Sequence, residues 1–146
     1  VVALTWCDNR RDPQYAISRD AEVRLRDARD ARGRTLAIIK LPQPGPLYST
    51  AAEARGVLAS EYAQPRPART RLAGSYVNFY IANGGIVMPL LDPRTDRIAA
   101  NHLKRAFPGR KVVGVPTREI LLGGGNIHCI TQQVPATGGK REQPKK

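Results

Sequence analysis

One stretch of this sequence predicts an order of secondary structure that only a few folds can accommodate. Residues 76–82 and 86–89 are rich in β-forming side chains, and Asn83-Gly84 joins them as in a tight hairpin. A helix is expected over residues 95–107, followed by a strand over residues 111–115. The apolar side chains that share one face of this helix are Ala99, Leu103, Ala106 and Phe107. The order strand, strand, helix, strand indicates an α/β fold.

The front of the chain predicts a strand, a helix and another strand. Residues 1–6 and residues 36–39 are the apolar, β-rich runs. Between them, Ser18 is expected to cap a helix with acidic residues in its first turn, and Gly33 is expected to end it.

The segment from Pro42 to about Thr70 lacks the periodicity of a helix or a strand. Proline recurs through it, which favours a long surface loop. Thr50 and Glu53 have the spacing of a capping box, so at most one short turn of helix is expected there. Loops of this length in a compact fold are usually functional or disordered.

Length and composition favour one soluble domain. The chain has 146 residues, of which 41% are hydrophobic, enough for a modest core. It has no apolar run long enough for a membrane span and no charged-then-apolar leader, so a cytoplasmic location is expected. Because the sequence begins with Val1 inside an apolar run, the chain is expected to be truncated at its front.

The net charge is strongly positive, since 24 Lys and Arg face 12 Asp and Glu, giving +12. Such a balance often indicates phosphate-rich partners. The basic residues are scattered, however, and do not alternate with aromatic residues as in single-strand binders. Nucleic-acid binding is therefore disfavoured, and residues 140–146 are expected to be a basic disordered tail behind a domain of residues 1–139. A small basic binding protein that contacts nucleic acid or another chain is the alternative.

Two cysteines, Cys7 and Cys129, lie far apart in the sequence. Without secretory features they are expected to be free thiols. No Cys-x-x-Cys or His-x-x-x-His spacing occurs, and His102 and His128 are too distant in sequence for a local ligand pair. No metal and no other cofactor are therefore expected.

Gly123-Gly124-Gly125 stands just before Asn126 and Cys129. Glycine adopts positive φ and lets the backbone approach a flat ligand. The run lacks the last glycine of a dinucleotide fingerprint and the Gly-Lys-Ser/Thr of a P-loop. A thiol behind such a turn is a candidate nucleophile.

The run GGGNIHCITQQ, residues 123–133, resembles the carboxy-terminal catalytic signature of agmatine deiminases, members of the guanidine-modifying superfamily. Three other segments resemble the same family in the same order, and the resemblance extends to about Pro135. They are Trp6 with residues 12–15, residues 74–84 and residues 107–114. The resemblance implies a partial pseudo-fivefold α/β propeller, to which this chain would contribute about two of five ββαβ modules.

The same resemblance implies a chemistry and a set of site residues. Cys129 would form a covalent intermediate with agmatine, release ammonia and leave N-carbamoylputrescine, while Gly124, Gly125 and Asn126 would bind the substrate. The family's histidine belongs to a His-x-Asp motif that would precede Val1, so the missing amino-terminal modules are expected partners. The isolated chain is expected to be inactive and to aggregate or form homo-oligomers. Peptidyl-arginine deimination shares the chemistry and stays open.

Four further residues are candidates for roles near the thiol. If residues 127–130 are extended, His128 points away from Cys129 and is structural. Asp8 and Asp12 are the nearest acids to the missing motif, and Asp12 before Pro13 is expected to serve as a turn or cap residue. Cys7 is expected to be a buried thiol at the end of a strand.

Overall fold

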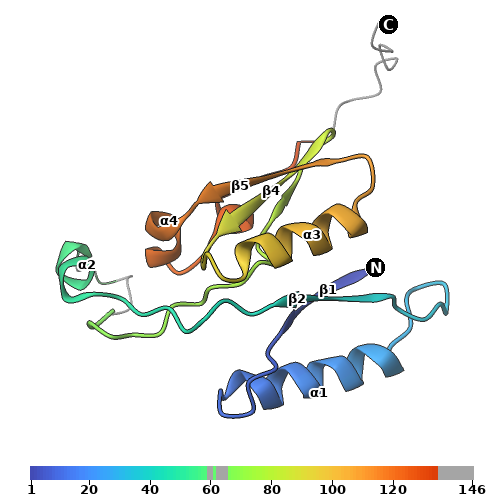
Figure 1. The fold of residues 1–146 in the computed structure, drawn as a ribbon, viewed down its shortest axis with the longest axis horizontal. Helices are drawn as coiled ribbons and strands as arrows, with labels where there is room; N and C mark the ends of the chain where they lie inside the picture. The colour runs from blue at the N-terminus through green and yellow to red at the C-terminus, as the bar shows by residue number, and fades with distance from the viewer. Residues whose placement is uncertain (59–60, 62–65, 135–146) are drawn as a thin grey trace, which may run out of the picture.

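The fold was obtained as a computed structural model, which describes residues 1–58, 61 and 66–134 (Figure 1). Its strands are β1 (Val2–Trp6), β2 (Ile38–Pro42), β3 (Tyr80–Ile81), β4 (Gly85–Leu90) and β5 (Lys111–Pro116). Its helices are α1 (Gln14–Asp27), α2 (Ala51–Gly56), α3 (Asp96–Ala106) and α4 (Arg118–Leu122), with a 3₁₀ turn η1 (Ile127–Ile130). The fold is mixed α/β, as the sequence predicts. The expected tail, residues 140–146, and residues 135–139 of the expected domain lie outside the described residues.

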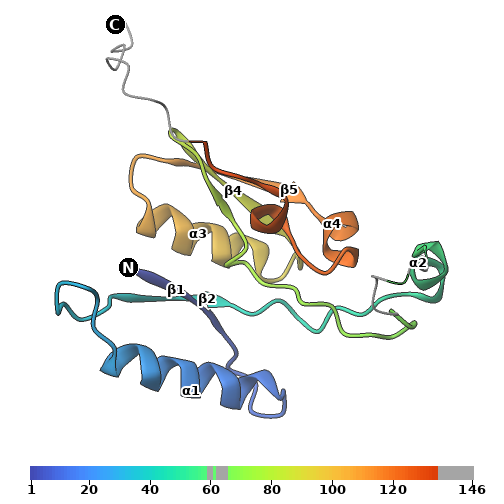
Figure 2. The same ribbon diagram turned by 180° about the vertical axis from the view of Figure 1, so that it is seen from behind.

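The described strands form two sheets. In the first, β1 and β2 pair in parallel and α1 connects them. In the second, β3 and β4 form an antiparallel hairpin, and α3 carries the chain from β4 to its parallel neighbour β5. Figures 1 and 2 show the layers in the order α1, first sheet, α3, second sheet. The helix α3 therefore packs against both sheets, contacting β2 as well as β4 and β5.

The hydrophobic core gathers around α3. Ala99 and Leu103 of this helix are fully buried, and both belong to the predicted apolar face. The cluster around them consists of Leu41, Tyr76, Phe79, Ile86 and Met88. Phe79 also meets Phe107 edge to face, with ring centroids 5.6 Å apart. The predicted hairpin, helix and final strand are thus confirmed, although the first hairpin strand covers only Tyr80–Ile81 because the chain before it turns into the core.

The prediction for α1 was wrong at both ends. The helix begins at Gln14, whose backbone N–H donates to the Asp12 carboxylate at 2.9 Å, and it ends at Asp27. Ser18 lies inside the helix and is buried, because its hydroxyl donates to the Thr5 carbonyl and accepts from the Cys7 N–H. Ser18 thus links the helix to β1, a tertiary use that the local sequence does not show.

Other boundaries shift less. The strand expected at residues 36–39 is β2, which lies slightly later because its pairing with β1 extends to Trp6 and Pro42. The short capped turn is α2, where Thr50 and Glu53 form the predicted capping box. No helix in the described part of the chain has both the length and the apolar character that crossing a membrane requires.

Candidate functional site

Cys129 lies on η1, immediately after the glycine turn. Asn126 begins η1: its side-chain oxygen accepts from the Ile127 N–H at 2.8 Å, and its carbonyl accepts from the Cys129 N–H at 2.9 Å. The condition that residues 127–130 are extended is therefore not met, because Asn126 caps a tight turn. In a 3₁₀ turn, neighbouring side chains lie about 120° apart rather than on opposite faces. The argument that His128 must point away from the thiol therefore fails, and His128 and Cys129 are both exposed.

Asn78 is the polar side chain that meets the thiol. Its Nδ2 donates to Sγ of Cys129 at 3.3 Å, while its Oδ1 accepts from the His128 N–H at 2.9 Å. Because a backbone N–H only donates, the amide oxygen must face His128 and the amide nitrogen is left for the sulfur. The Asn78 hydrogen bond, followed by backbone contacts at Asn126, lowers the pKa of Cys129 below its ordinary value. The arrangement thus stabilises the thiolate, which is the reactive form.

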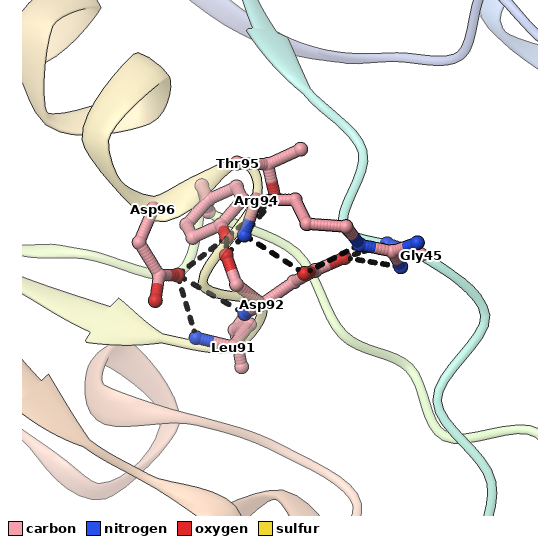
Figure 3. Close-up of polar contacts among 7 residues, drawn as sticks. Gly45, Leu91, Asp92, Arg94, Thr95 and Asp96 are labelled. Carbon is pink, nitrogen blue, oxygen red and sulfur yellow. Dashed lines mark hydrogen bonds and ion pairs between the residues drawn. The ribbon is translucent and has the colours of Figure 1, made fainter.

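The segment that carries Asn78 is anchored two residues earlier by Tyr76. This side chain is fully buried, and its hydroxyl donates to the Asp96 carboxylate at 2.5 Å. Burial, followed by the bond to Asp96, raises the pKa of Tyr76, so the hydroxyl stays a donor. The same Asp96 oxygen accepts from the backbone N–H groups of Leu91 and Asp92 (Figure 3). The start of α3 therefore anchors the segment from which Asn78 reaches the thiol.

Asp92 extends this network to the loop after β2. Its carboxylate accepts from Arg94 at 2.9 and 3.0 Å and from the Gly45 N–H at 3.0 Å (Figure 3). The Arg94 guanidinium holds the pKa of Asp92 well below its usual range. The carboxylate is thus a structural tie between the two sheets, since Gly45 follows β2 and Asp92 follows β4.

The glycine turn is shaped for the thiol. Gly124 has a φ of +94°, so the positive φ expected of this run occurs here. A Cβ on Gly125 would stand 2.7 Å from Cβ and 2.9 Å from Sγ of Cys129. Gly125 is therefore required because the cysteine side chain lies against its backbone. Asn126 is fully buried: its side-chain oxygen shapes the turn by accepting from the Ile127 N–H, and its Nδ2 has no partner among the described residues.

The other sequence candidates lie at the end of β1. Cys7 is a buried free thiol directly after the strand, as predicted. Asp12 pairs with Arg71 at 2.8 and 3.0 Å, and its carboxylate accepts from the Gln14 N–H in the turn that leads into α1, so its predicted turn role is confirmed. The Arg71 hydrogen bond lowers the pKa of Asp12. Asp8 accepts from the Trp6 indole at 2.8 Å. His102 lies on α3, where burial lowers its pKa.

Asp8 and His102 line a cavity of about 560 Å³ at this end of the molecule, and Cys129 is not among its described lining residues. Within the described ranges, no group of three or more His, Cys, Asp or Glu could hold a metal ion.

Asn78 is the site residue that the sequence patterns did not predict. Its only signals were its place inside the matching segment 74–84 and its polarity between the apolar neighbours Val77 and Phe79.

This geometry agrees with comparisons to known proteins. Residues 1–135 match the model of the Porphyromonas-type peptidyl-arginine deiminase family. The chain therefore belongs to that family, and its mixed α/β fold is similar to that of solved agmatine and arginine deiminases.

Individual relatives show how far the similarity extends. A Yersinia pseudotuberculosis protein named "Putative agmatine deiminase" is 61% identical over 135 residues, which cover 92% of this chain and 37% of that protein. The solved agmatine deiminase of Enterococcus faecalis has a TM-score of 0.81 and 36% identity, over 91% of this chain and 36% of that one. A solved "Putative Arginine Deiminase" of Porphyromonas gingivalis has a TM-score of 0.74 and 26% identity, over 91% and 34%.

The resemblance of the run GGGNIHCITQQ to the signature of agmatine deiminases is thus confirmed. The chain spans little more than a third of the length of these relatives, since the matched residues cover 37% of the Yersinia protein.

Proposed function

We propose that Cys129 is the nucleophile in the hydrolysis of agmatine, or of a related small guanidine, to a urea and ammonia. The thiolate attacks the guanidinium carbon, a proton donor protonates one terminal nitrogen, the C–N bond to that nitrogen breaks, and ammonia leaves. Water then attacks the resulting amidino-thioether, the C–S bond breaks, and N-carbamoylputrescine leaves while the thiol is restored. The observation that carries this proposal is the exposed Sγ of Cys129, held against Gly125 and hydrogen-bonded by the Asn78 amide.

The physical basis of this assignment is the thiolate. An ordinary thiol has a pKa of about 8.5 and is only slightly ionised near neutral pH. The Asn78 amide donates to the sulfur and so favours the charged form, and a cationic substrate would favour it further. Exposure of Cys129 leaves the sulfur open to a guanidinium arriving from outside the chain.

The site also needs a proton donor and acids that grip a cation. The contacts described above for the Cys129 side chain and its N–H are with Asn78, Gly125 and Asn126. None of these three residues has a titratable side chain. We propose that these groups come from modules like those of the longer relatives, assembled with this chain into a pseudo-fivefold propeller around Cys129, and that the enzyme acts in the cytoplasm.

A segment exchange tests this function. Residues 1–135 of this chain, inserted in place of the matched segment of the Yersinia relative, are expected to support ammonia release from agmatine. The Cys129→Ala exchange should abolish release, and Cys7→Ser, which alters the other thiol, should leave it intact. The 146-residue chain alone should release none, because loss of a general acid-base group typically costs about 10²–10⁴-fold. Release by the Cys129→Ala variant would refute the assignment.

The family name and the Porphyromonas gingivalis structure favour a second candidate substrate, an arginine side chain or free arginine. The same exchange protein can be supplied with benzoyl-arginine amide and with agmatine at equal concentrations. We expect agmatine to be preferred, since the matching signature is that of the small-amine enzymes. Preference for the arginine amide would instead assign the peptidyl substrate.

A further inference from the structure

The helix α4 ends where the glycine turn begins, and its last carbonyls are held from far away in the sequence. The Arg66 guanidinium donates through Nη1 to the Leu122 carbonyl and through Nη2 to the Gly123 carbonyl, the latter at 2.9 Å. A helix leaves its final carbonyls without intrahelical partners. A planar guanidinium can serve two of them at once, and its positive charge suits the negative end of the helix.

The same guanidinium covers the next residue of the turn. A Cβ on Gly124 would overlap the Arg66 head group, with Cζ only 2.9 Å away. Gly124 also has a φ of +94°, a conformation that favours glycine whatever room the Arg66 side chain leaves. Arg66 therefore lies directly on the turn that leads to Cys129.

The contacts continue without a gap from Arg66 to the thiol. Arg66 touches Gly123 and Gly124, and the next residue, Gly125, lies in contact with the Cys129 side chain. Gly125 follows Gly124 directly in the chain and its backbone lies against the cysteine side chain, so a shift of the turn at Gly124 is passed on to the place where Sγ is seated. The hydrogen bond from Asn78 to Sγ, at 3.3 Å, depends on that placement.

We propose that Arg66 is a positioning residue for the nucleophile. It clamps the end of α4 and the glycine turn, and so holds Sγ of Cys129 on the Asn78 amide. Its relevance to catalysis rests on the proposed function, in which Cys129 attacks the substrate. Arg66 itself touches only the backbone of the turn in these contacts, so it acts through Gly124 and Gly125.

The other end of α4 offers a matched control. Arg118, at the start of α4, donates to the Glu53 carboxylate at 2.8 Å and to the Tyr48 carbonyl at 2.6 Å. Arg66 and Arg118 thus fasten the same helix through guanidinium groups, but only Arg66 touches the glycine turn. Arg118→Ala removes an equivalent anchor without touching the route to the thiol.

The test is the pH profile of Cys129 alkylation by iodoacetamide in the 146-residue chain, with mass spectrometry reporting Cys129 and Cys7 separately. The range should run from about pH 6 to about pH 10, which brackets an ordinary thiol pKa of about 8.5. Cys7 is 5% exposed, so its labelling reports unfolding in the same sample. No substrate is needed, so the result does not depend on agmatine turnover.

In Arg66→Ala the profile should move to higher pH, and alkylation near neutral pH should slow by about 2- to 10-fold, the usual worth of one hydrogen bond. Arg66→Lys should behave in the same way, because an ammonium cannot form the two-armed contact. Arg118→Ala should keep the original profile, and Cys7 should stay protected throughout.

Three results would overturn the proposal. The first is an unchanged profile in Arg66→Ala. The second is full rescue by Arg66→Lys, which would make charge alone sufficient. The third is labelling of Cys7 in step with Cys129 in both Arg66 variants, which would make Arg66 a global rather than a local anchor. If the exchange protein hydrolyses agmatine but the profile does not move, only the clamp is wrong. If the profile moves but no ammonia is released, only the proposed function is wrong.

Discussion

Gly125→Ala should damage the site through a single methyl group. The added Cβ would stand 2.7 Å from Cβ and 2.9 Å from Sγ of Cys129. Non-bonded carbon atoms prefer separations of about 3.5–4.0 Å, so the cysteine side chain or the turn must shift by about 1 Å. A misplacement of that size at a reacting group can cost about 10²-fold in rate. The expected result is a loss of ammonia release of that order.

The assay pairs two measurements on two variants. Ammonia release is measured in the exchange protein, and Cys129 alkylation is measured in the isolated chain. Gly56→Ala is the control, since a Cβ there meets nothing within 4 Å and its φ is not positive. Gly56→Ala should match wild type in both assays, whereas Gly125→Ala should lose activity and shift the alkylation profile. Wild-type behaviour of Gly125→Ala in both assays would refute the idea that the thiol is seated on this glycine.

Three other predictions follow from contacts around the site. Asn78→Asp keeps the acceptor for the His128 N–H but turns a carboxylate toward Cys129, so the pKa of Cys129 should rise. Alkylation of Cys129 near neutral pH should then slow by about 10-fold, and an unchanged rate would contradict the contact between Asn78 and the thiol. Arg118 holds the pKa of Glu53 at about 2, below its usual 4.5, so the stabilisation is present above about pH 4.5 and is lost as the pH falls toward 2. Thermal unfolding should therefore depend on acid pH more steeply in wild type than in Glu53→Gln, and parallel curves would reject the link. In the described sheets only β4 has a neighbour on both sides, so the other four strands leave edges open and the chain should self-associate in sedimentation equilibrium. A monodisperse monomer with one sharp unfolding transition would count against this expectation.

The second sheet was predictable because its signals are local. Asn83-Gly84 specifies a hairpin within a few residues, and the buried Ala99 and Leu103 recur at helical spacing along α3. The capping box of α2 is likewise complete within four residues. Such features need no knowledge of the rest of the fold, so the bounds of β4, α3 and β5 come out within about a residue, whereas β3 covers only Tyr80–Ile81 of the expected residues 76–82.

Most of the errors involve partners that lie elsewhere in the chain. Ser18 has the sequence context of a helix cap but lies inside α1, where it bonds Thr5 on β1 and Cys7 just after that strand. Asn78 contacts a thiol 51 residues away, and Arg66 contacts the end of α4 56 residues away. No local pattern in one sequence encodes such pairs. The η1 turn was missed for a different reason: a single side-chain cap at Asn126 sets the conformation of the four residues Ile127–Ile130.

The central claim is that Cys129 is the residue that attacks a guanidinium, and chloroacetamidine tests it most directly. This small electrophilic amidine resembles the substrate head group and alkylates a thiol that is placed to receive it. In the exchange protein, peptide mass spectrometry should locate the label at Cys129, and excess agmatine should protect that site while ammonia release is lost in proportion to labelling. Labelling confined to Cys7, or full activity after complete labelling of Cys129, would contradict the account.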